Sequence, residues 1–243
     1  MKKLPLIMIF LLMAFAFSAC GFEVNIDAEK GSGNVITETR DVSGFDRVVL
    51  SGIGDVQVEQ GESESLEIEA EDNLMEYITT EVRDGVLYIG FERKAILPTE
   101  NIRFNLTMID VRGLETEGVS NIQADKINTD SLDVSIGGTG NINIDDLSTE
   151  RLNVTISGAG NFNVEGKAGR QSVKLSGAGN YDGERLESQE ADVEINGLGK
   201  ITVWVTEELD ATISGAGNVD YYGNPEVRQQ ISGLGRLKHE GDK

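Results

Sequence analysis

The side chains that most often carry enzymatic chemistry are scarce in this sequence. His239 is its only histidine and Cys20 its only cysteine. A serine–histidine–acid triad, a histidine general base or a histidine-rich metal site would have to use His239, which we expect to lie in a frayed polar tail. A lone cysteine supports neither a disulfide framework nor a cysteine-based metal site. We therefore predict no catalytic residue, no cofactor-binding residue and no metal ligand.

Carboxylates, in contrast, are abundant. The sequence holds 42 Asp and Glu against 21 Lys and Arg, which gives a formal net charge of −21. Asp145-Asp146 and Glu207-Glu208 could supply the acid pair that a carbohydrate-cleaving β-helix needs, but adjacent acids in so negative a chain are more simply a solvated face. Nucleic acid and anionic lipid are disfavoured as partners because like charges repel.

Weaker signals concern calcium and sugars. Residues 137–142 resemble half of a calcium-binding nonapeptide repeat, but the period here is about twice as long, which leaves only weak calcium binding open. Trp204, the only tryptophan, could form a sugar-stacking surface with Tyr221 and Tyr222, or could simply pack. An Asp-Ser-Leu stretch fits the short pattern at which Bacteroidetes-type bacteria attach O-glycans, so Ser131 is a candidate glycosylation site.

The amino-terminal segment indicates the compartment in which this chemistry would take place. Two lysines precede a nearly unbroken apolar run at 4–17, and small residues at 18 and 19 lead into Cys20. This is the pattern of a secretory signal, and Phe-Ser-Ala-Cys resembles a bacterial lipobox. We predict a lipoprotein signal at 1–19, cleavage before Cys20 and acylation there, which would anchor the chain in a membrane. An ordinary secretory signal, with Cys20 a bystander, is the alternative.

The rest of the chain is organised by a repeated Gly-x-Gly turn, usually followed by Asn. From a degenerate copy at Gly118, the first glycines recur at 138, 158, 177, 197, 215 and 233, in steps of 20, 20, 19, 20, 18 and 18 residues. A constant period of this length is the signature of a repeat architecture. The turn residues are Gly52, Gly54, Gly138, Gly140, Asn141, Gly158, Gly160, Asn161, Gly177, Gly179, Asn180, Gly197, Gly199, Gly215, Gly217, Asn218, Gly233 and Gly235.

Alternating apolar strands flank each turn, and short strands of this kind bury their apolar face only when neighbouring repeats stack. We therefore predict an all-β fold, a single-chain parallel β-solenoid (β-helix), right-handed. Gly at each corner would supply positive φ, and the asparagines would stack as an amide ladder. An antiparallel meander of hairpins is the competing fold. The predicted inward residues are Leu132, Val134, Ile136, Ile142, Ile144, Leu152, Val154, Ile156, Phe162, Val164, Val173, Leu175, Val193, Ile195, Ile201, Val203, Ala211, Ile213, Val219 and Tyr221.

The amino-terminal half is less regular. Residues 20–41 are predicted to form an acylated tether and a first strand, and residues 42–243 the solenoid. Within it, residues 59–110 are an excursion that contains a hairpin turned by Asp84-Gly85 and that caps the open edge. Residues 111–238 are the regular rungs.

These features resemble one family of bacterial envelope proteins. A Phe-Asp-x-Val opening at Phe45, the long hairpin excursion and the serial Ser-Gly-Ala-Gly-Asn turns, which end near residues 222–225, are similar to the putative auto-transporter adhesin, head GIN domain family, formerly a domain of unknown function. The resemblance covers about residues 42–238. It implies a β-helical fold and an exported lipoprotein, often from Bacteroidetes-type bacteria, and it brings no catalytic residues.

The expected function is that of a non-enzymatic envelope lipoprotein. We expect residence in the outer membrane of a Gram-negative bacterium, facing either the periplasm or the exterior, with a rigid solenoid face that binds a glycan or protein. A carbohydrate-active enzyme and a purely structural envelope protein are the alternatives that the sequence leaves open.

Overall fold

The structure is a computed structural model, and it describes residues 28–92 and 95–243. The predicted signal at 1–19 and the predicted lipidation site at Cys20 lie outside these residues. Strands dominate the described chain, and its helical structure is one 3-10 turn, η1 (Met75–Tyr77). Among the described residues, no helix has the length and apolar character needed to cross a membrane.

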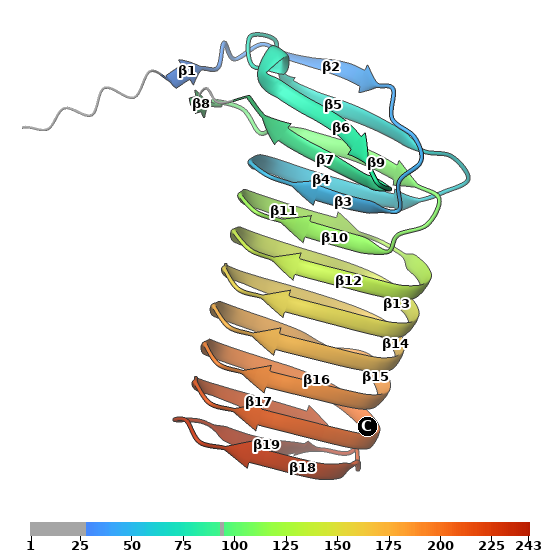
Figure 1. Cartoon of the computed structure of the whole chain (residues 1–243), viewed down its shortest axis with the longest axis vertical. Helices are drawn as coiled ribbons and strands as arrows, with labels where there is room; N and C mark the ends of the chain where they lie inside the picture. The colour runs from blue at the N-terminus through green and yellow to red at the C-terminus, as the bar shows by residue number, and fades with distance from the viewer. Residues whose placement is uncertain (1–27, 93–94) are drawn as a thin grey trace, which may run out of the picture.

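Long parallel strands form the body of the molecule, as the repeat predicts. The strands are β10 (Gly113–Thr116), β11 (Val119–Ala124), β12 (Ile127–Ile136), β13 (Thr139–Ile156), β14 (Ala159–Leu175), β15 (Ala178–Ile195), β16 (Leu198–Ile213), β17 (Ala216–Tyr222), β18 (Glu226–Ile231) and β19 (Arg236–Gly241). Each pairs in parallel with the strand one repeat away, for example Asn141 with Asn161. Figure 1 shows the resulting stack of rungs. The predicted β-solenoid is confirmed, and the antiparallel meander is wrong.

Each full rung has two long faces and one short face. In β13 the inside–outside alternation is interrupted twice by two successive exposed residues, first at Asp145-Asp146 and then at Glu150-Arg151. Because alternation is broken only where a strand turns a corner, residues 139–145 form the first long face, 146–150 the short face and 151–156 the second long face. In Figure 1 the ribbon bends round the short face on the right, opposite the turns on the left.

The core runs through the centre of the stack. The inward residues predicted from alternation are buried, except that Tyr221 is only partly buried at the edge of the core. The apolar residues that fill the short face were not predicted, because each stands alone between two polar neighbours. They include Ile127, Leu147 and Leu186, all fully buried.

Most of the turn glycines are required because neighbouring rungs stack closely there, and not because the backbone needs a positive φ. The prediction that glycine supplies positive φ at each corner is therefore wrong for most of these positions. Only Gly54, Gly140 and Gly199 of the predicted set have a positive φ below 160°. A Cβ on Gly158 would lie 2.0 Å from the carbonyl oxygen of Gly138, and one on Gly179 would lie 1.9 Å from that of Gly160. A side chain at these positions would therefore push neighbouring rungs apart.

The asparagine ladder exists, but its members differ from the prediction. Asn218 is not in it, because Lys200 stands in register between Asn180 and Asn218. At the other end the ladder extends further than predicted. The ladder begins at Asp55, whose carboxylate accepts from the side-chain amide of Asn121 at 2.8 Å. Each later asparagine then donates to the asparagine one rung before it: Asn141 to Asn121 at 3.1 Å, Asn161 to Asn141 at 2.8 Å and Asn180 to Asn161 at 2.8 Å.

The amino-terminal end of the solenoid is covered by a layer of mixed pairing. Its strands are β1 (Ala28–Lys30), β2 (Val35–Arg40), β5 (Ser65–Glu71), β6 (Ile78–Arg83), β7 (Val86–Phe91), β8 (Ala95–Leu97) and β9 (Arg103–Met108), which lie on the first rung, β3 (Arg47–Leu50) and β4 (Ile53–Gln60). Strand β7 stacks in parallel on β3, and β9 stacks in parallel on β4. Strand β6 pairs antiparallel with β7, β5 with β9, and β2 with β5, whereas β1 and β8 form a separate parallel pair. Asp84 and Gly85, with φ of 50° and 77°, make the predicted hairpin turn. We call residues 59–110 with β2 the cap.

Buried Glu71 fastens the segment before β2 to the cap. Its carboxylate accepts hydrogen bonds from the backbone N–H of Gly33 at 2.7 Å and of Thr99 at 2.9 Å, and from the Thr99 hydroxyl. The hydroxyl bond from Thr99 is the largest cause of a lowered pKa of Glu71, and these backbone bonds add to it although burial opposes them. The segment around Gly33 is therefore held by hydrogen bonds to a charged carboxylate. We call these hydrogen bonds to Glu71 the clasp.

The last rung extends further than predicted. Strand β19 reaches Gly241 rather than ending at 238, and it pairs with β17. His239 is thus part of a strand, and the expected frayed tail is wrong. Its ring stacks on Tyr221 with centroids 4.9 Å apart, and Nε2 lies 2.8 Å from the carbonyl oxygen of Gly223.

Candidate binding site

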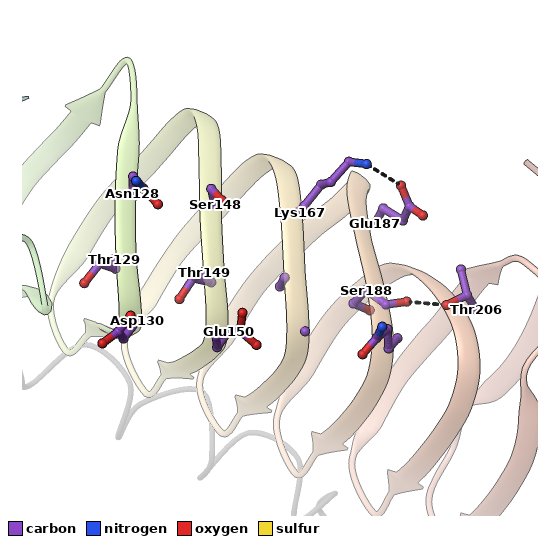
Figure 2. Close-up of a pocket in the computed structure, with 13 residues that line it drawn as sticks. Asn128, Thr129, Asp130, Ser148, Thr149, Glu150, Lys167, Glu187, Ser188 and Thr206 are labelled. Carbon is purple, nitrogen blue, oxygen red and sulfur yellow. Dashed lines mark hydrogen bonds and ion pairs between the residues drawn. The ribbon is translucent and has the colours of Figure 1, made fainter.

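A polar trough runs across the short face over successive rungs. It has a volume of about 440 Å³. Figure 2 shows equivalent residues of neighbouring rungs side by side, Asn128 beside Ser148 and Thr129 beside Thr149. The trough is lined by Asn128, Thr129, Asp130, Ser148, Thr149, Glu150, Lys167, Ala168, Gly169, Glu187, Ser188, Gln189 and Thr206. Its surface therefore combines hydroxyl, amide, carboxylate and ammonium groups from neighbouring rungs.

A shorter rung deepens the middle of the trough. Between Ile144 and Leu147 the register of β13 with β14 shifts, so that Leu147 pairs with Gly166. Gly166 has φ +123°, and a Cβ there would lie 2.1 Å from the Leu147 carbonyl oxygen, so only glycine fits this corner. Lys167, Ala168 and Gly169 follow in the lining of the trough, and the last two offer little side chain between the rungs on either side.

Neighbouring groups fix the orientation of the polar side chains in the trough. The Thr129 hydroxyl donates to Asp110 at 2.8 Å, and the Thr149 hydroxyl donates to the carbonyl oxygen of Arg151 at 3.0 Å. Burial alone would raise the pKa of Asp110, but the hydrogen bonds from Arg112 and Thr129 outweigh it and lower that pKa. The trough is thus pre-arranged for hydrogen bonding.

The charge along the trough is mainly negative. Asp130, Glu150 and Glu187 line it against a single basic residue, Lys167. The Lys167 ammonium lies 3.5 Å from the Glu187 carboxylate, which partly neutralises both, as the dashed line in Figure 2 shows. The trough therefore presents donors and acceptors inside a negative field, which suits a neutral polar ligand better than an anion.

A buried polar network supports the trough from behind. Tyr181 donates its hydroxyl to Gln171 at 2.7 Å, Gln171 donates to the Ser188 hydroxyl at 2.7 Å, and Ser188 donates to the carbonyl oxygen of Trp204 at 3.0 Å. Burial, followed by the charge of Asp182, raises the pKa of Tyr181, so this hydroxyl stays protonated. The column that holds Gln171 is otherwise apolar, with Leu152 and Ala191 as its neighbours. The network therefore distinguishes these rungs from the others.

One acid of each pair considered in the sequence forms an ion pair with a basic side chain. Asp146 is ion-paired with Lys126 at 2.8 Å, and Glu208 is ion-paired with Arg228. A glycosidase needs two carboxyl groups on either side of the scissile bond, roughly 5–10 Å apart. Among the described residues, no group of histidine, cysteine or acidic side chains is arranged to hold a metal ion.

The trough was not predicted from the sequence, and the residues predicted as structural turns lie at the opposite edge. The predicted turn residues, from Gly52 to Gly235, lie where the two long faces meet, opposite the short face, and contact neighbouring rungs. We call this the narrow edge. Ser131, the candidate glycosylation site, is half-buried at the start of the second long face. The signal that could have located the trough is the doubled polar residue at each corner, such as Glu150-Arg151, which breaks the alternation.

Comparisons with known proteins agree with this architecture. A family model described as putative auto-transporter adhesin, head GIN domain, matches residues 44–225. A solved structure of a putative adhesin from Bacteroides fragilis has a TM-score of 0.82 at 26% identity, over 86% of this chain and 99% of that one. No curated protein matches the chain.

Two further solved structures share the fold. A putative lipid binding protein from Parabacteroides distasonis has a TM-score of 0.72 at 23% identity, over 86% of this chain and 98% of that one. A putative adhesin from Parabacteroides merdae has a TM-score of 0.70 at 24% identity, over 88% of this chain and 99% of that one. The family model covers most of the chain, and the protein therefore belongs to the putative auto-transporter adhesin, head GIN domain family.

Proposed function

We propose that this protein is a non-enzymatic adhesive module of the cell envelope that binds a neutral glycan along the short face. The observation that carries the proposal is the polar trough, which places hydroxyl, amide and carboxylate groups on neighbouring rungs from Asn128 to Thr206. The family and the relative described as a putative adhesin support an adhesive role.

A repeating ligand suits a repeating surface. Successive rungs of a parallel stack are about 4.8 Å apart, so the polar side chains of β12 to β16 follow one another at that interval along the trough. A polymer rich in hydroxyl groups can therefore form hydrogen bonds on several rungs, and weak contacts add up along its length. Solenoids commonly use such extended surfaces for binding.

The charge of the protein narrows the class of glycan. Both the whole chain, at −21, and the acids of the trough disfavour a polyanion. The trough has hydrogen-bond donors and acceptors but no aromatic side chain in its lining. It therefore favours a neutral sugar that is bound mainly through its hydroxyl groups.

The attachment to the membrane is the second part of the proposal. Acylation at Cys20 would hold the solenoid on the outer membrane of a Gram-negative, Bacteroidetes-type bacterium, facing the periplasm or the exterior. The lipobox-like sequence supports this placement, and so does the origin of the relatives in Bacteroides and Parabacteroides. The segment between Cys20 and the cap would act as the tether.

A binding panel tests the proposed ligand class. The chain from residue 20 onwards, with Cys20→Ser so that it cannot be acylated (the soluble form), is titrated with neutral and with anionic polysaccharides. We expect saturable binding to a neutral polysaccharide and a loss of at least about tenfold in Ser148→Tyr, which places a ring in the trough. Thr155→Tyr is the matched control on the second long face of the same rung, since both positions are exposed strand residues.

Other outcomes of this panel separate the alternatives. Equal loss in both tyrosine variants would show that the trough is not the site. Turnover of a polysaccharide would replace the adhesive role by an enzymatic one. Absence of binding to every polysaccharide would leave a purely structural envelope protein.

A further inference from the structure

At the corner where the first long face meets the short face, an ammonium group lies in an aromatic and acidic cage. The Lys243 Nζ lies 4.4 Å from the ring centroid of Tyr222 and 5.4 Å from that of Trp204. It donates to the carbonyl oxygen of Glu184 at 2.7 Å and lies 3.3 Å from Glu184 Oε1. The Lys243 side chain is only 25% exposed. We call Glu184, Trp204 and Tyr222 the cage.

The cage is assembled from three neighbouring rungs. Glu184 belongs to β15, Trp204 to β16 and Tyr222 to β17, and Trp204 pairs in register with Tyr222. The rings therefore stand beside each other on adjacent strands. Their negative π-faces attract a cation that lies over them.

A bulge in β15 supplies the acceptor. Gly183 pairs with Val203 and Glu187 with Trp204, so residues 184–186 have no opposite residue in β16. The Glu184 carbonyl is therefore available to accept a hydrogen bond from outside the sheet. The Glu184 carboxylate adds a charge beside it, and desolvation, together with this carboxylate, raises the pKa of Tyr222.

We infer that the cage is a binding site for a lysine side chain of a partner protein, and that Lys243 occupies it in the unbound molecule. A carbonyl and a carboxylate oxygen both require N–H donors, so a primary ammonium fits and a quaternary ammonium would leave the carbonyl without a donor. Lys243 itself shows which chemistry the cage accepts. The net charge of −21 would steer a lysine-bearing partner towards the protein.

The occupied state lowers the apparent affinity for the partner. A tethered Lys243 competes at a high effective concentration, so a ligand ammonium must displace it. Removal of the Lys243 charge should therefore open the site without affecting the trough on the short face, which does not include the cage residues.

Trp204 is the only tryptophan of the chain, so its fluorescence reports on the cage alone. The soluble form is titrated with Nα-acetyl-lysine amide, whose ε-amine is free, and with the same probe acetylated on the ε-amine. We expect a saturable change in Trp204 emission, with half-saturation in Lys243→Ala at a concentration about tenfold lower than in the parent. The ε-acetylated probe should give no response.

Matched variants complete the test. Lys174→Ala removes a lysine that is ion-paired with Glu194 elsewhere, and it should leave both the emission and the titration unchanged. Tyr222→Leu combined with Lys243→Ala should abolish the response, with circular dichroism to verify the fold. An unchanged half-saturation in Lys243→Ala, or equal binding of the ε-acetylated probe, would overturn the inference. Glucosamine or phosphoethanolamine binding more tightly than the lysine probe would overturn the assignment to a protein partner.

Discussion

The two edges of the solenoid place different demands on the sequence. Along the narrow edge, each rung approaches the next so closely that a Cβ on Gly158 would lie 2.0 Å from the Gly138 carbonyl oxygen. Along the short face, the equivalent positions are Thr149, Ala168 and Ser188, which differ in size and polarity. The narrow edge keeps glycine at these positions because the backbones of neighbouring rungs are in contact there. The short face carries different side chains at these three registered positions, and it is where the chemistry of the molecule varies.

The largest effect is expected at the narrow edge. In Gly138→Ala the new Cβ would lie 2.0 Å from the Gly118 carbonyl oxygen, so two rungs must separate. We expect a loss of about 3 kcal/mol or more in the free energy of unfolding, measured by urea denaturation. In the adjacent control, Gly137→Ala, the Cβ would lie 3.4 Å from the Thr116 carbonyl oxygen, and we expect a change below about 1 kcal/mol. Similar losses in both variants would contradict the stacking explanation.

The buried network behind the short face should show the next largest effect. Tyr181→Phe leaves Gln171 Oε1 buried without the hydroxyl that now donates to it at 2.7 Å. We expect a loss of about 1–3 kcal/mol in urea denaturation. Adding Gln171→Leu, which restores the residue type of Leu152 in the same column, should recover most of that loss. Tyr88→Phe, at an exposed tyrosine, is the control. A double variant no more stable than Tyr181→Phe would show that the network does not act as a unit.

The asparagine ladder should contribute less. Asn161 donates to Asn141 and accepts from Asn180, both at 2.8 Å, at a partly solvated edge. We expect Asn161→Ala to cost about 1 kcal/mol in thermal or urea unfolding. Asn218→Ala, whose neighbours in the column are Lys200 and Arg236, should cost less than about 0.5 kcal/mol. Equal costs would mean that the amide ladder contributes nothing beyond the strand itself.

The most local effect is expected in the cap at low pH. The pKa of Glu71 is lowered from 4.5, so its clasp is fully present above about pH 4.5 and is lost as the pH falls through the folded-state value. Amide hydrogen exchange at Gly33 and Thr99 should therefore accelerate in acid relative to the rungs. In Glu71→Gln that additional acid dependence should disappear. Exchange at both amides that keeps the same pH dependence in the variant would rule out the clasp.

Much of the fold could be predicted from the sequence because two signals coincide. The period of the turns indicates parallel stacking, and alternation indicates which residues, such as Ile142 and Val154, point inward. The short face could not be predicted in this way, because a single apolar residue such as Leu147 between two corners shows no hydrophobic period. The cap was predicted as an excursion with a hairpin that covers the open edge, but the stacking of β7 on β3 could not be predicted because it is set by tertiary packing.

The candidate site was hidden from the sequence for a related reason. The trough depends on a rung shortened at Gly166, and the cage depends on a bulge at residues 184–186. Both are departures from the repeat, whereas the sequence signal comes from its regularity. Trp204 and Tyr222 stood out as aromatic residues, but only the register shows that they share a corner with Glu184.

The central claim is that the narrow edge stacks the rungs and the short face binds ligand. Amide chemical shifts of the ¹⁵N-labelled soluble form, titrated with a neutral polysaccharide, test it most directly. We predict saturable shifts concentrated at residues 128–130, 148–150, 167–169 and 187–189, which line the trough, with the turn amides at 137–140 and 157–160 unmoved. Shifts centred on the turns, shifts spread evenly over all faces, or no saturable shift with any neutral polysaccharide would contradict it.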